Sequence, residues 1–232
     1  MLYDGRNVCL YGADIRALGA MGDAAFARLP LARRQKAMRF VQRDDRLRCA
    51  AAGLLLRCVL GIAEEEPLAC NAFGKPYAPG HPPFNLAHGG NYTVLAVGKT
   101  PVGADVEPVA EYNDELAQQV LLPDEAAWVS AAPRERFALL WTRKESVMKA
   151  LGLGLGLPPQ SFSVLPADSA AHAAACSMIF LKTWMYDAHA FSVAGFSPEL
   201  PDAVVLLTPQ QLLGKESPGA YRQPFPMPEQ KG

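Results

Sequence analysis

The chain has 232 residues, of which half are hydrophobic and 19% are charged. This balance is typical of a folded globular protein and excludes an intrinsically disordered one. Twenty-two basic and 23 acidic residues give a net charge of −1, which excludes a generally basic nucleic-acid-binding protein. Five cysteines without a C-x-x-C pair indicate free thiols in a reducing compartment. Asp4 and Arg6 precede any apolar run, and no apolar run could span a bilayer. We therefore expect a cytoplasmic protein without a signal peptide.

Helices precede strands in the first half of the chain. The pattern of apolar residues predicts a short helix over residues 31–41 and a stronger one over 44–60, which ends at Gly61. From about residue 68, the turn motifs GKPY, PGHPPF and HGGNY indicate strands and turns. Residues 93–107 are predicted to form a hairpin around a turn at 98–101.

The second half repeats this order. Helices are predicted near residues 112–120, 124–131 and 134–151, then strands at 161–165, 177–186, 189–196 and 203–208, and a helical turn at 209–213. Residues 215–232 are rich in Pro, Gly and charge, which predicts a disordered tail. The repeated layout predicts an α+β fold with an N-terminal half at 1–109 and a C-terminal half at 110–214.

Two acids stand close together at the end of the predicted hairpin. Asp105 and Glu107 are two residues apart on a strand, so both carboxylates project from the same face. Two neighbouring carboxylates repel one another unless a cation or water intervenes, and hard oxygen ligands suit Mg²⁺. The alternative is an edge strand with a solvated polar face.

The segment WTRKESVMK places charge where a helix usually carries its apolar face. Trp141, Lys144, Glu145, Met148 and Lys149 fall on one helical stripe, which favours a helix that lines a cleft. The alternative is a surface helix with an ordinary Glu145–Lys149 pair.

Two further features indicate anion binding. His88 precedes Gly89 and Gly90, whose main-chain N–H groups could approach a phosphate. A run of basic residues is also a candidate anion site, although a solvated helix face explains it equally well: Arg33, Arg34, Lys36, Arg39, Arg43, Arg46 and Arg48.

Four motifs occur in a specific order: GKPY (74–77), FNLAHGG (84–90), VGADVEP (102–108) and WTRKESVMKALGLGL (141–155). Together they resemble the consecutive signature blocks of the 4′-phosphopantetheinyl transferases, above all the larger, surfactin-synthetase-activating type. The family transfers the phosphopantetheine arm of coenzyme A to a serine of an apo acyl or peptidyl carrier protein, as in polyketide or nonribosomal peptide biosynthesis, and releases 3′,5′-ADP. The resemblance implies an α+β pseudo-dimer of two similar halves with the active site at their interface. Pseudo-dimeric members of the family can act as monomers, so we expect a monomer. The charge balance and the short apolar runs predict neither a nucleic-acid nor a membrane partner.

The resemblance also assigns residues. Asp105, Glu107 and Glu145 are expected to hold Mg²⁺ on the coenzyme A pyrophosphate, and Lys149 to contact phosphate at the reacting end. Glu145 is the expected general base. The residues expected to bind coenzyme A elsewhere are Gly74, Lys75 and Pro76, the segment of Asn85, Ala87 and His88, and the basic Arg33, Lys36 and Arg48.

The third motif departs from the family pattern N-[LIV]-S-H-[ST]. Ala87 and Gly89 occupy the hydroxyl positions, so hydroxyl contacts to phosphate are lost there and main-chain contacts remain. The alternative function is a non-catalytic module that binds coenzyme A and carrier proteins.

Overall fold

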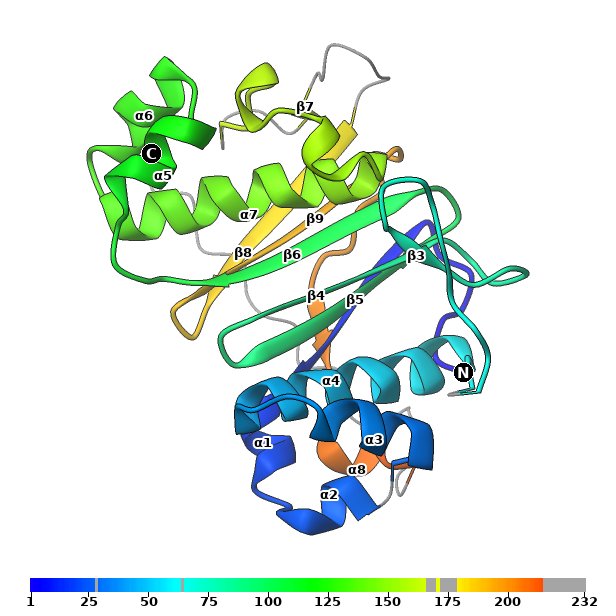
Figure 1. The fold of residues 1–232 in the computed structure, drawn as a ribbon. Helices are drawn as coiled ribbons and strands as arrows, with labels where there is room; N and C mark the ends of the chain where they lie inside the picture. The colour runs from blue at the N-terminus through cyan, green and yellow to red at the C-terminus, as the bar shows by residue number, and fades with distance from the viewer. Residues whose placement is uncertain (28, 64, 166–169, 172–178, 215–232) are drawn as a thin grey trace.

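The fold consists of four layers, in the order helices, sheet, sheet, helices (Figure 1). The computed structural model describes residues 1–27, 29–63, 65–165, 170–171 and 179–214. The predicted strand start at 177–178 and the predicted tail at 215–232 therefore lie outside the described residues. The mixed composition of helices and strands confirms the predicted α+β class. No helix among the described residues is both long and apolar enough to cross a membrane.

The first sheet has the strand order β10-β1-β5-β4. Its strands are β1 (Val8–Asp14), β4 (Phe84–Gly89), β5 (Tyr92–Gly98) and β10 (Val204–Leu206). Its outer face is covered by α1 (Ile15–Gly19), α2 (Asp23–Ala27), α3 (Leu31–Met38), α4 (Arg43–Leu55) with its π-helical extension η1 (Leu56–Leu60), and α8 (Pro209–Leu212) (Figure 1). Acids in the first turn of α4 and the left-handed Gly61 after η1 define this helix as predicted.

The second sheet has the order β6-β9-β8-β7. Its strands are β6 (Val102–Pro108), β7 (Ala170–Ala171), β8 (Ile179–Tyr186) and β9 (His189–Gly195). The helices of this half are α5 (Asp114–Val120), α6 (Pro123–Val129) and α7 (Pro133–Leu151), followed by the 3₁₀ turns η2 (Gly154–Gly156) and η3 (Pro159–Ser161). Pro133 in the first turn and the left-handed Gly152 bound α7, close to the predicted 134–151.

Three apolar cores separate the layers. One lies between α4 and the first sheet, one between the two sheets, and one between α7 and the second sheet. The middle core takes Val102, Ala104 and Val106 from β6, so the intervening residues of β6 face α7. β6 precedes the predicted division at 109/110 but lies in the second sheet. β10 follows the division but lies in the first sheet.

The predicted hairpin at 93–107 is wrong. β5 and β6 follow one another in sequence but lie in different sheets, and each pairs elsewhere. The actual hairpin is β4–β5, whose tight turn is formed by the HGGN segment. Local turn signals at 98–101 show that the chain changes direction there, but pairing depends on which apolar face each strand buries.

Other predictions have mixed outcomes. The helices at 31–41, 112–120 and 124–131 and the turn at 209–213 are confirmed with shifts at their ends, and so are the strands at 179–186, 189–195 and 204–206. The strand predicted at 161–165 is wrong, because the chain forms η3 there and then irregular structure. Of the cysteines in the described residues, Cys49, Cys58 and Cys70 are free thiols. A two-stranded ribbon of β2 (Ala69–Cys70) and β3 (Pro76–Tyr77) frames the GKPY motif.

Candidate active site

Asp105 and Glu107 project from β6 toward α7. Val106 between them points into the core between the sheets, which leaves both carboxylates on the opposite face, as predicted. Asp105 is only 2% exposed and Glu107 is half-buried. The alternative, an edge strand with a solvated polar face, is therefore wrong in one respect: β6 does lie at the edge of the second sheet, but its polar face is buried toward α7.

Glu145 and Lys149 reach this pair from α7. The Lys149 Nζ atom lies 2.5 Å from Asp105 Oδ1 and 3.6 Å from Glu145 Oε2. Helix and strand come this close because β6 has Gly103 at the crossing: a Cβ there would lie 2.0 Å from the Ser146 carbonyl oxygen. Glycine is thus required for α7 to bring its charged residues to β6.

The electrostatics of the four residues show a crowded anionic site. Burial raises the pKa of Asp105 to about 6, against the opposing effect of Lys149. Burial and the neighbouring Asp105 and Glu145 raise the pKa of Glu107 to about 7. Burial lowers the pKa of Lys149, but the three carboxylates more than compensate, and the net shift is upward.

The donor set fits a hard divalent cation. The second oxygen of Asp105, Oδ2, is buried and has no hydrogen-bond partner among the residues that the structure describes. Carboxylate oxygens of Asp105, Glu107 and Glu145 are the ligand type that Mg²⁺ prefers, and a cation would relieve their repulsion. Within the described part of the chain, no three His, Cys, Asp or Glu side chains are already close enough to hold a metal ion. In this arrangement the Lys149 ammonium supplies the positive charge between Asp105 and Glu145.

The predicted polar stripe on α7 divides into two parts. Lys144 is fully buried and points away from Asp105, to Glu125 on α6. Its Nζ atom lies 2.8 Å from each of Glu125 Oε2, the Pro159 carbonyl and the Phe162 carbonyl, so every donor of the ammonium is used. Met148 is buried in the outer core. The stripe as a whole therefore does not line a cleft, because residues 100° apart on α7 face different neighbours.

His88 and Arg48 approach the same region from the first half. The imidazole lies at the end of β4, and its pKa is lowered by partial desolvation and by the positive charges of Arg48 and Lys149. Charges from both halves thus act on one another. Arg48 donates two hydrogen bonds to the Gly90 carbonyl, at 3.0 and 2.7 Å, and pairs with Asp45.

The neighbouring predicted residues on β4 are buried. Asn85 Oδ1 accepts a 2.8 Å bond from the Ala104 N–H and so fastens β4 to β6. Ala87 packs in the core between the sheets. At the hydroxyl position of residue 89, an ideal Cβ would lie 2.0 Å from the Val106 carbonyl oxygen, which explains the glycine.

The GKPY loop is fastened to the end of α7. The Lys75 ammonium donates to the carbonyls of Val102 and Ala150, at 2.8 and 3.3 Å, and burial lowers its pKa to about 8. Asn71 Nδ2 donates to the Gly152 carbonyl, and Asn71 Oδ1 accepts from the main chain at residues 73 and 75. Gly74, with φ of +84°, forms the turn before Pro76.

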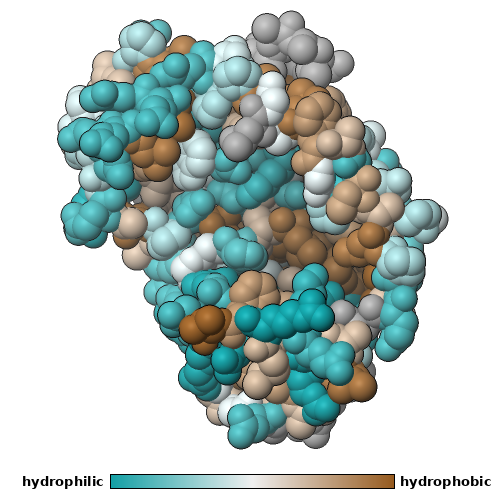
Figure 2. Space-filling model, viewed as in Figure 1, coloured by the Kyte–Doolittle hydropathy of each residue, from teal (hydrophilic) through white to brown (hydrophobic). Residues whose placement is uncertain are grey.

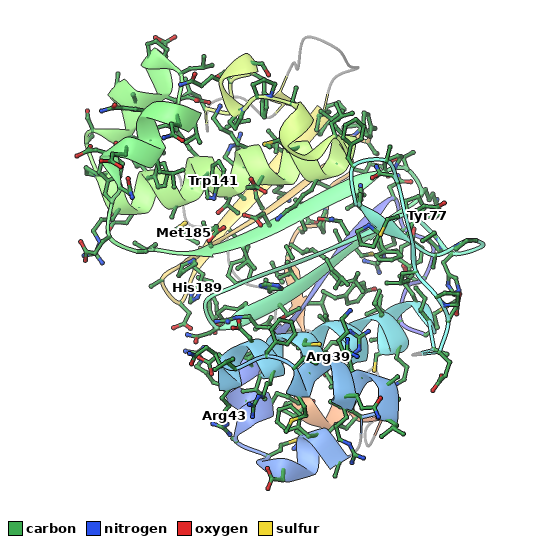
Figure 3. The ribbon with its side chains drawn as sticks, viewed as in Figure 1. Arg39, Arg43, Tyr77, Trp141, Met185 and His189 are labelled. Carbon is green, nitrogen blue, oxygen red and sulfur yellow. The ribbon has the colours of Figure 1, made fainter. Side chains whose placement is uncertain are left out.

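Arg33 and Lys36 line a cavity of about 290 Å³ between α3, η1 and residues 62–63 and 66–68. No residue of the acidic site lines this cavity. Figure 2 shows that the viewed face is hollowed between the part that carries α7 and the part that carries α3 and α4. Trp141 lies on the α7 side of the hollow and Arg39 on the other side (Figure 3).

Sequence reasoning missed the contacts that join the two sheets at one end. Arg16 Nη2 lies 2.6 Å from Asp187 Oδ2 in the β8–β9 turn and 2.9 Å from the Tyr92 hydroxyl on β5. His189 accepts a hydrogen bond from the Asn91 N–H. The YDAH segment (186–189) indicates a turn in the sequence. Nothing in it indicates that Asp187 accepts a hydrogen bond from Tyr92, 95 residues earlier.

Comparison with known proteins finds a family model and several relatives that this chain resembles. The model of the 4′-phosphopantetheinyl transferase superfamily matches residues 101–196, which contain β6 and α7. A 4′-phosphopantetheinyl transferase of Bacillus subtilis is 29% identical over 208 residues, covering 82% of this chain and 92% of the relative. The transferase Sfp of Bacillus subtilis strain 168 is 27% identical, covering 78% of this chain and 88% of the relative. The transferase gsp of Aneurinibacillus migulanus is 33% identical over a match that covers 56% of this chain and 59% of the relative.

Proposed function

The chain belongs to the 4′-phosphopantetheinyl transferase superfamily, an enzyme family, and from this premise we propose the reaction and its residues. The chain transfers the 4′-phosphopantetheine arm of coenzyme A to a serine of an apo acyl or peptidyl carrier protein, depends on Mg²⁺, and releases 3′,5′-ADP. The observation that carries the proposal is the junction of β6 and α7, where Asp105, Glu145 and Lys149 converge.

The acids and Lys149 have separate tasks. Asp105, Glu107 and Glu145 would hold Mg²⁺, which when bound neutralises charge on the pyrophosphate. Lys149 contributes a further positive charge to the phosphate at the reacting end. Its raised pKa keeps the ammonium protonated at neutral pH. The ion pair with Asp105, at 2.5 Å, holds the Lys149 side chain in place before coenzyme A binds.

Glu145 is the proposed general base. The serine oxygen attacks the β-phosphorus, a new P–O bond forms, and the P–O bond to the leaving 3′,5′-ADP breaks. The serine proton passes to the Glu145 carboxylate. Glu145 lies on the rim of the site, partly exposed, where an incoming hydroxyl can reach it.

The remaining positive groups are proposed to bind phosphate away from the reacting bond. His88 and Arg48 lie on the first half, within electrostatic range of Lys149 on the second. Arg33 and Lys36 share their own cavity. The main chain of Gly74–Pro76 and the Lys75 stem would hold the adenine side, while Asn85 and Ala87 would support this part of the site from β4.

This assignment supports the proposal of a pseudo-dimer with the active site between its halves. Each sheet has one long helix on its outer face, α4 on the first and α7 on the second. The division at 109/110, the monomeric state and the cytoplasmic location stay predictions.

A transfer assay tests the function. An apo carrier protein domain is incubated with coenzyme A and MgCl₂, and its mass is measured. We expect a gain of one phosphopantetheine arm, and no gain when EDTA is added, when the carrier serine is replaced by Ala, or with the Glu145→Gln variant. Binding of coenzyme A without any mass gain would support the non-catalytic alternative.

A further inference from the structure

His189 is buried at the joint between the two sheets and has no part in the proposed reaction. Its side chain is 4% exposed, at the start of β9. Asp187 and Ala188 before it are left-handed, with φ of 49° and 53°, and turn the chain sharply out of β8. Figure 3 shows His189 at the end of the hairpin that lies next to the β4–β5 turn.

Both ring nitrogens are engaged. Nδ1 lies 2.6 Å from the Asp187 carbonyl oxygen, and Nε2 lies 3.2 Å from the Asn91 nitrogen. Because the Asn91 N–H is a donor, Nε2 is the acceptor, and Nδ1 carries the proton that it donates to Asp187. Tyr92 packs against the ring edge to face, with centroids 4.9 Å apart. The imidazole therefore has one orientation.

The turn that His189 contacts is also held from the opposite direction. Arg48 on α4 donates two hydrogen bonds to the Gly90 carbonyl oxygen. Gly90 itself is left-handed, and an ideal Cβ there would lie 2.2 Å from His189 Nε2 and 3.2 Å from the Pro108 Cβ. The main chain of the turn is thus enclosed between a helix of the first half and a strand of the second.

This enclosure bears on His88, which lies two residues before Gly90. With Ala87 and Gly89 on either side, the segment has no hydroxyl to fix a phosphate, so recognition depends on the imidazole and on main-chain N–H groups. A tight turn that contains two glycines is mobile unless other parts of the chain form hydrogen bonds with its backbone. Only an orientation fixed in advance avoids an ordering cost when the ligand binds.

We infer that His189 is a positioning residue for the 3′-phosphate subsite: it fixes the 88–91 turn, and through it His88, by accepting the Asn91 N–H. The inference rests on the proposed function, which brings the 3′-phosphate of coenzyme A to His88. His189 touches no substrate. Its effect is confined to groups that depend on this turn, so it acts on binding of the nucleotide and leaves the chemistry at Glu145 and Lys149 unchanged.

The test compares two nucleotides that differ by the 3′-phosphate. Isothermal titration calorimetry measures the affinity of 3′,5′-ADP and of 5′-AMP for the wild type, His189→Phe and His189→Gln. Phe keeps the aromatic packing but cannot accept a hydrogen bond, whereas the Gln amide oxygen can. We expect His189→Phe to weaken the binding of 3′,5′-ADP about five- to tenfold, the effect of losing the hydrogen bond from the Asn91 N–H, and to leave the binding of 5′-AMP unchanged. His189→Gln restores most of the affinity.

A neighbouring variant supplies the control. Tyr92→Phe removes a 2.9 Å bond to Asp187 at the same joint but no bond to the 88–91 turn. It should leave the preference for 3′,5′-ADP unchanged. In steady-state transfer assays, His189→Phe should raise KM for coenzyme A by the same factor, with kcat and KM for the carrier protein within about twofold of the wild type.

Several outcomes would overturn the inference. One is a His189→Phe variant that melts earlier but keeps the wild-type preference for 3′,5′-ADP, because its role would then be structural only. Another is an equal loss for both nucleotides. If His189→Phe does not fold, His189→Ala carries the same comparison. A wild type that transfers phosphopantetheine but does not prefer 3′,5′-ADP removes the inference and leaves the proposed function intact. A wild type that neither binds 3′,5′-ADP nor transfers the arm refutes both.

Discussion

The Nζ atom of Lys149 lies 2.5 Å from Asp105 Oδ1, while Oδ2 of the same carboxylate is buried without a hydrogen-bond partner in the described part of the chain. One oxygen of the carboxylate is thus neutralised by the ammonium that α7 supplies, and the other is not. Burial and the nearby carboxylates raise the pKa values of Asp105 and Glu107. β6 thus carries two carboxylates at this site, but α7 supplies only the Lys149 ammonium to neutralise them. A bound cation would supply the missing positive charge.

We therefore expect magnesium to stabilise the protein in the absence of coenzyme A. The wild type should show a higher Tm as MgCl₂ increases, since a ligand that binds only the folded state raises its stability. Asp105→Asn should abolish this increase. The measurement is differential scanning fluorimetry with NaCl at matched ionic strength as the control, and an equal response of both proteins would contradict a site at Asp105.

The three acids should differ in their effect on transfer. Asp105→Ala and Glu145→Ala should abolish detectable transfer, because they extend from different elements and both are needed to hold the ion between strand and helix. Glu107→Ala should leave measurable activity, because Mg²⁺ readily replaces a ligand by water.

The role of Glu145 as base can be separated from metal binding. Loss of a general base lowers the rate by about 10²–10⁴, and a high Mg²⁺ concentration cannot restore it. The measurement is kcat against Mg²⁺ concentration for all three variants, with folding checked by circular dichroism. Recovery of Glu145→Ala to near wild-type turnover at high Mg²⁺ would show that the base lies elsewhere.

The buried Lys144–Glu125 pair should affect stability strongly. Both side chains are fully buried, and Glu125 also accepts the N–H groups of Leu122 and Val164. Lys144→Met leaves a carboxylate uncompensated in the interior and should lower the free energy of unfolding by about 3–5 kcal/mol. Urea denaturation measures this loss.

A double variant is the control for that prediction. Adding Glu125→Gln removes the uncompensated charge while the amide oxygen still accepts a main-chain N–H. We expect Lys144→Met with Glu125→Gln to recover a large part of the lost stability. If the losses simply added, the two residues would not interact as a pair.

Stability should also depend on pH through Lys75. Burial lowers the pKa of this lysine from its usual value to about 8, so the unfolded chain binds the proton more tightly than the folded one. The contribution of Lys75 to stability is therefore lowest below pH 8 and rises as pH increases through the interval between the two pKa values. Because the side chain is partly exposed, the change is about 1–3 kcal/mol or less.

The comparison with Lys75→Met isolates this effect. The difference in unfolding free energy between Lys75→Met and the wild type should be most favourable to the variant at pH 7 and shrink toward pH 10. Urea titrations at both pH values measure it. A difference that is independent of pH would contradict the buried, charge-penalised state of Lys75.

Much of the local structure and the chemistry could be predicted from the sequence. The acids at 105 and 107 alternate with buried residues, and a period of two determines their shared face wherever they pair. The ends of α7 follow from Pro133 and Gly152, whose preferences are local. The order of the four motifs indicated the family without knowledge of how the chain folds back on itself.

Only the tertiary structure decided which of these charged residues meet. Lys144 and Lys149 lie five residues apart on one helix, yet Lys144 pairs in the core with Glu125 and Lys149 reaches Asp105, because α7 packs against β6 on one side and against α6 on another. Strands β5 and β6 are adjacent in the chain but pair in different sheets. In the β4–β5 turn, Gly90 is bonded by Arg48, 42 residues away, and Asn91 by His189, 98 residues away. Such contacts depend on long-range packing free energy, which no local pattern of residues contains.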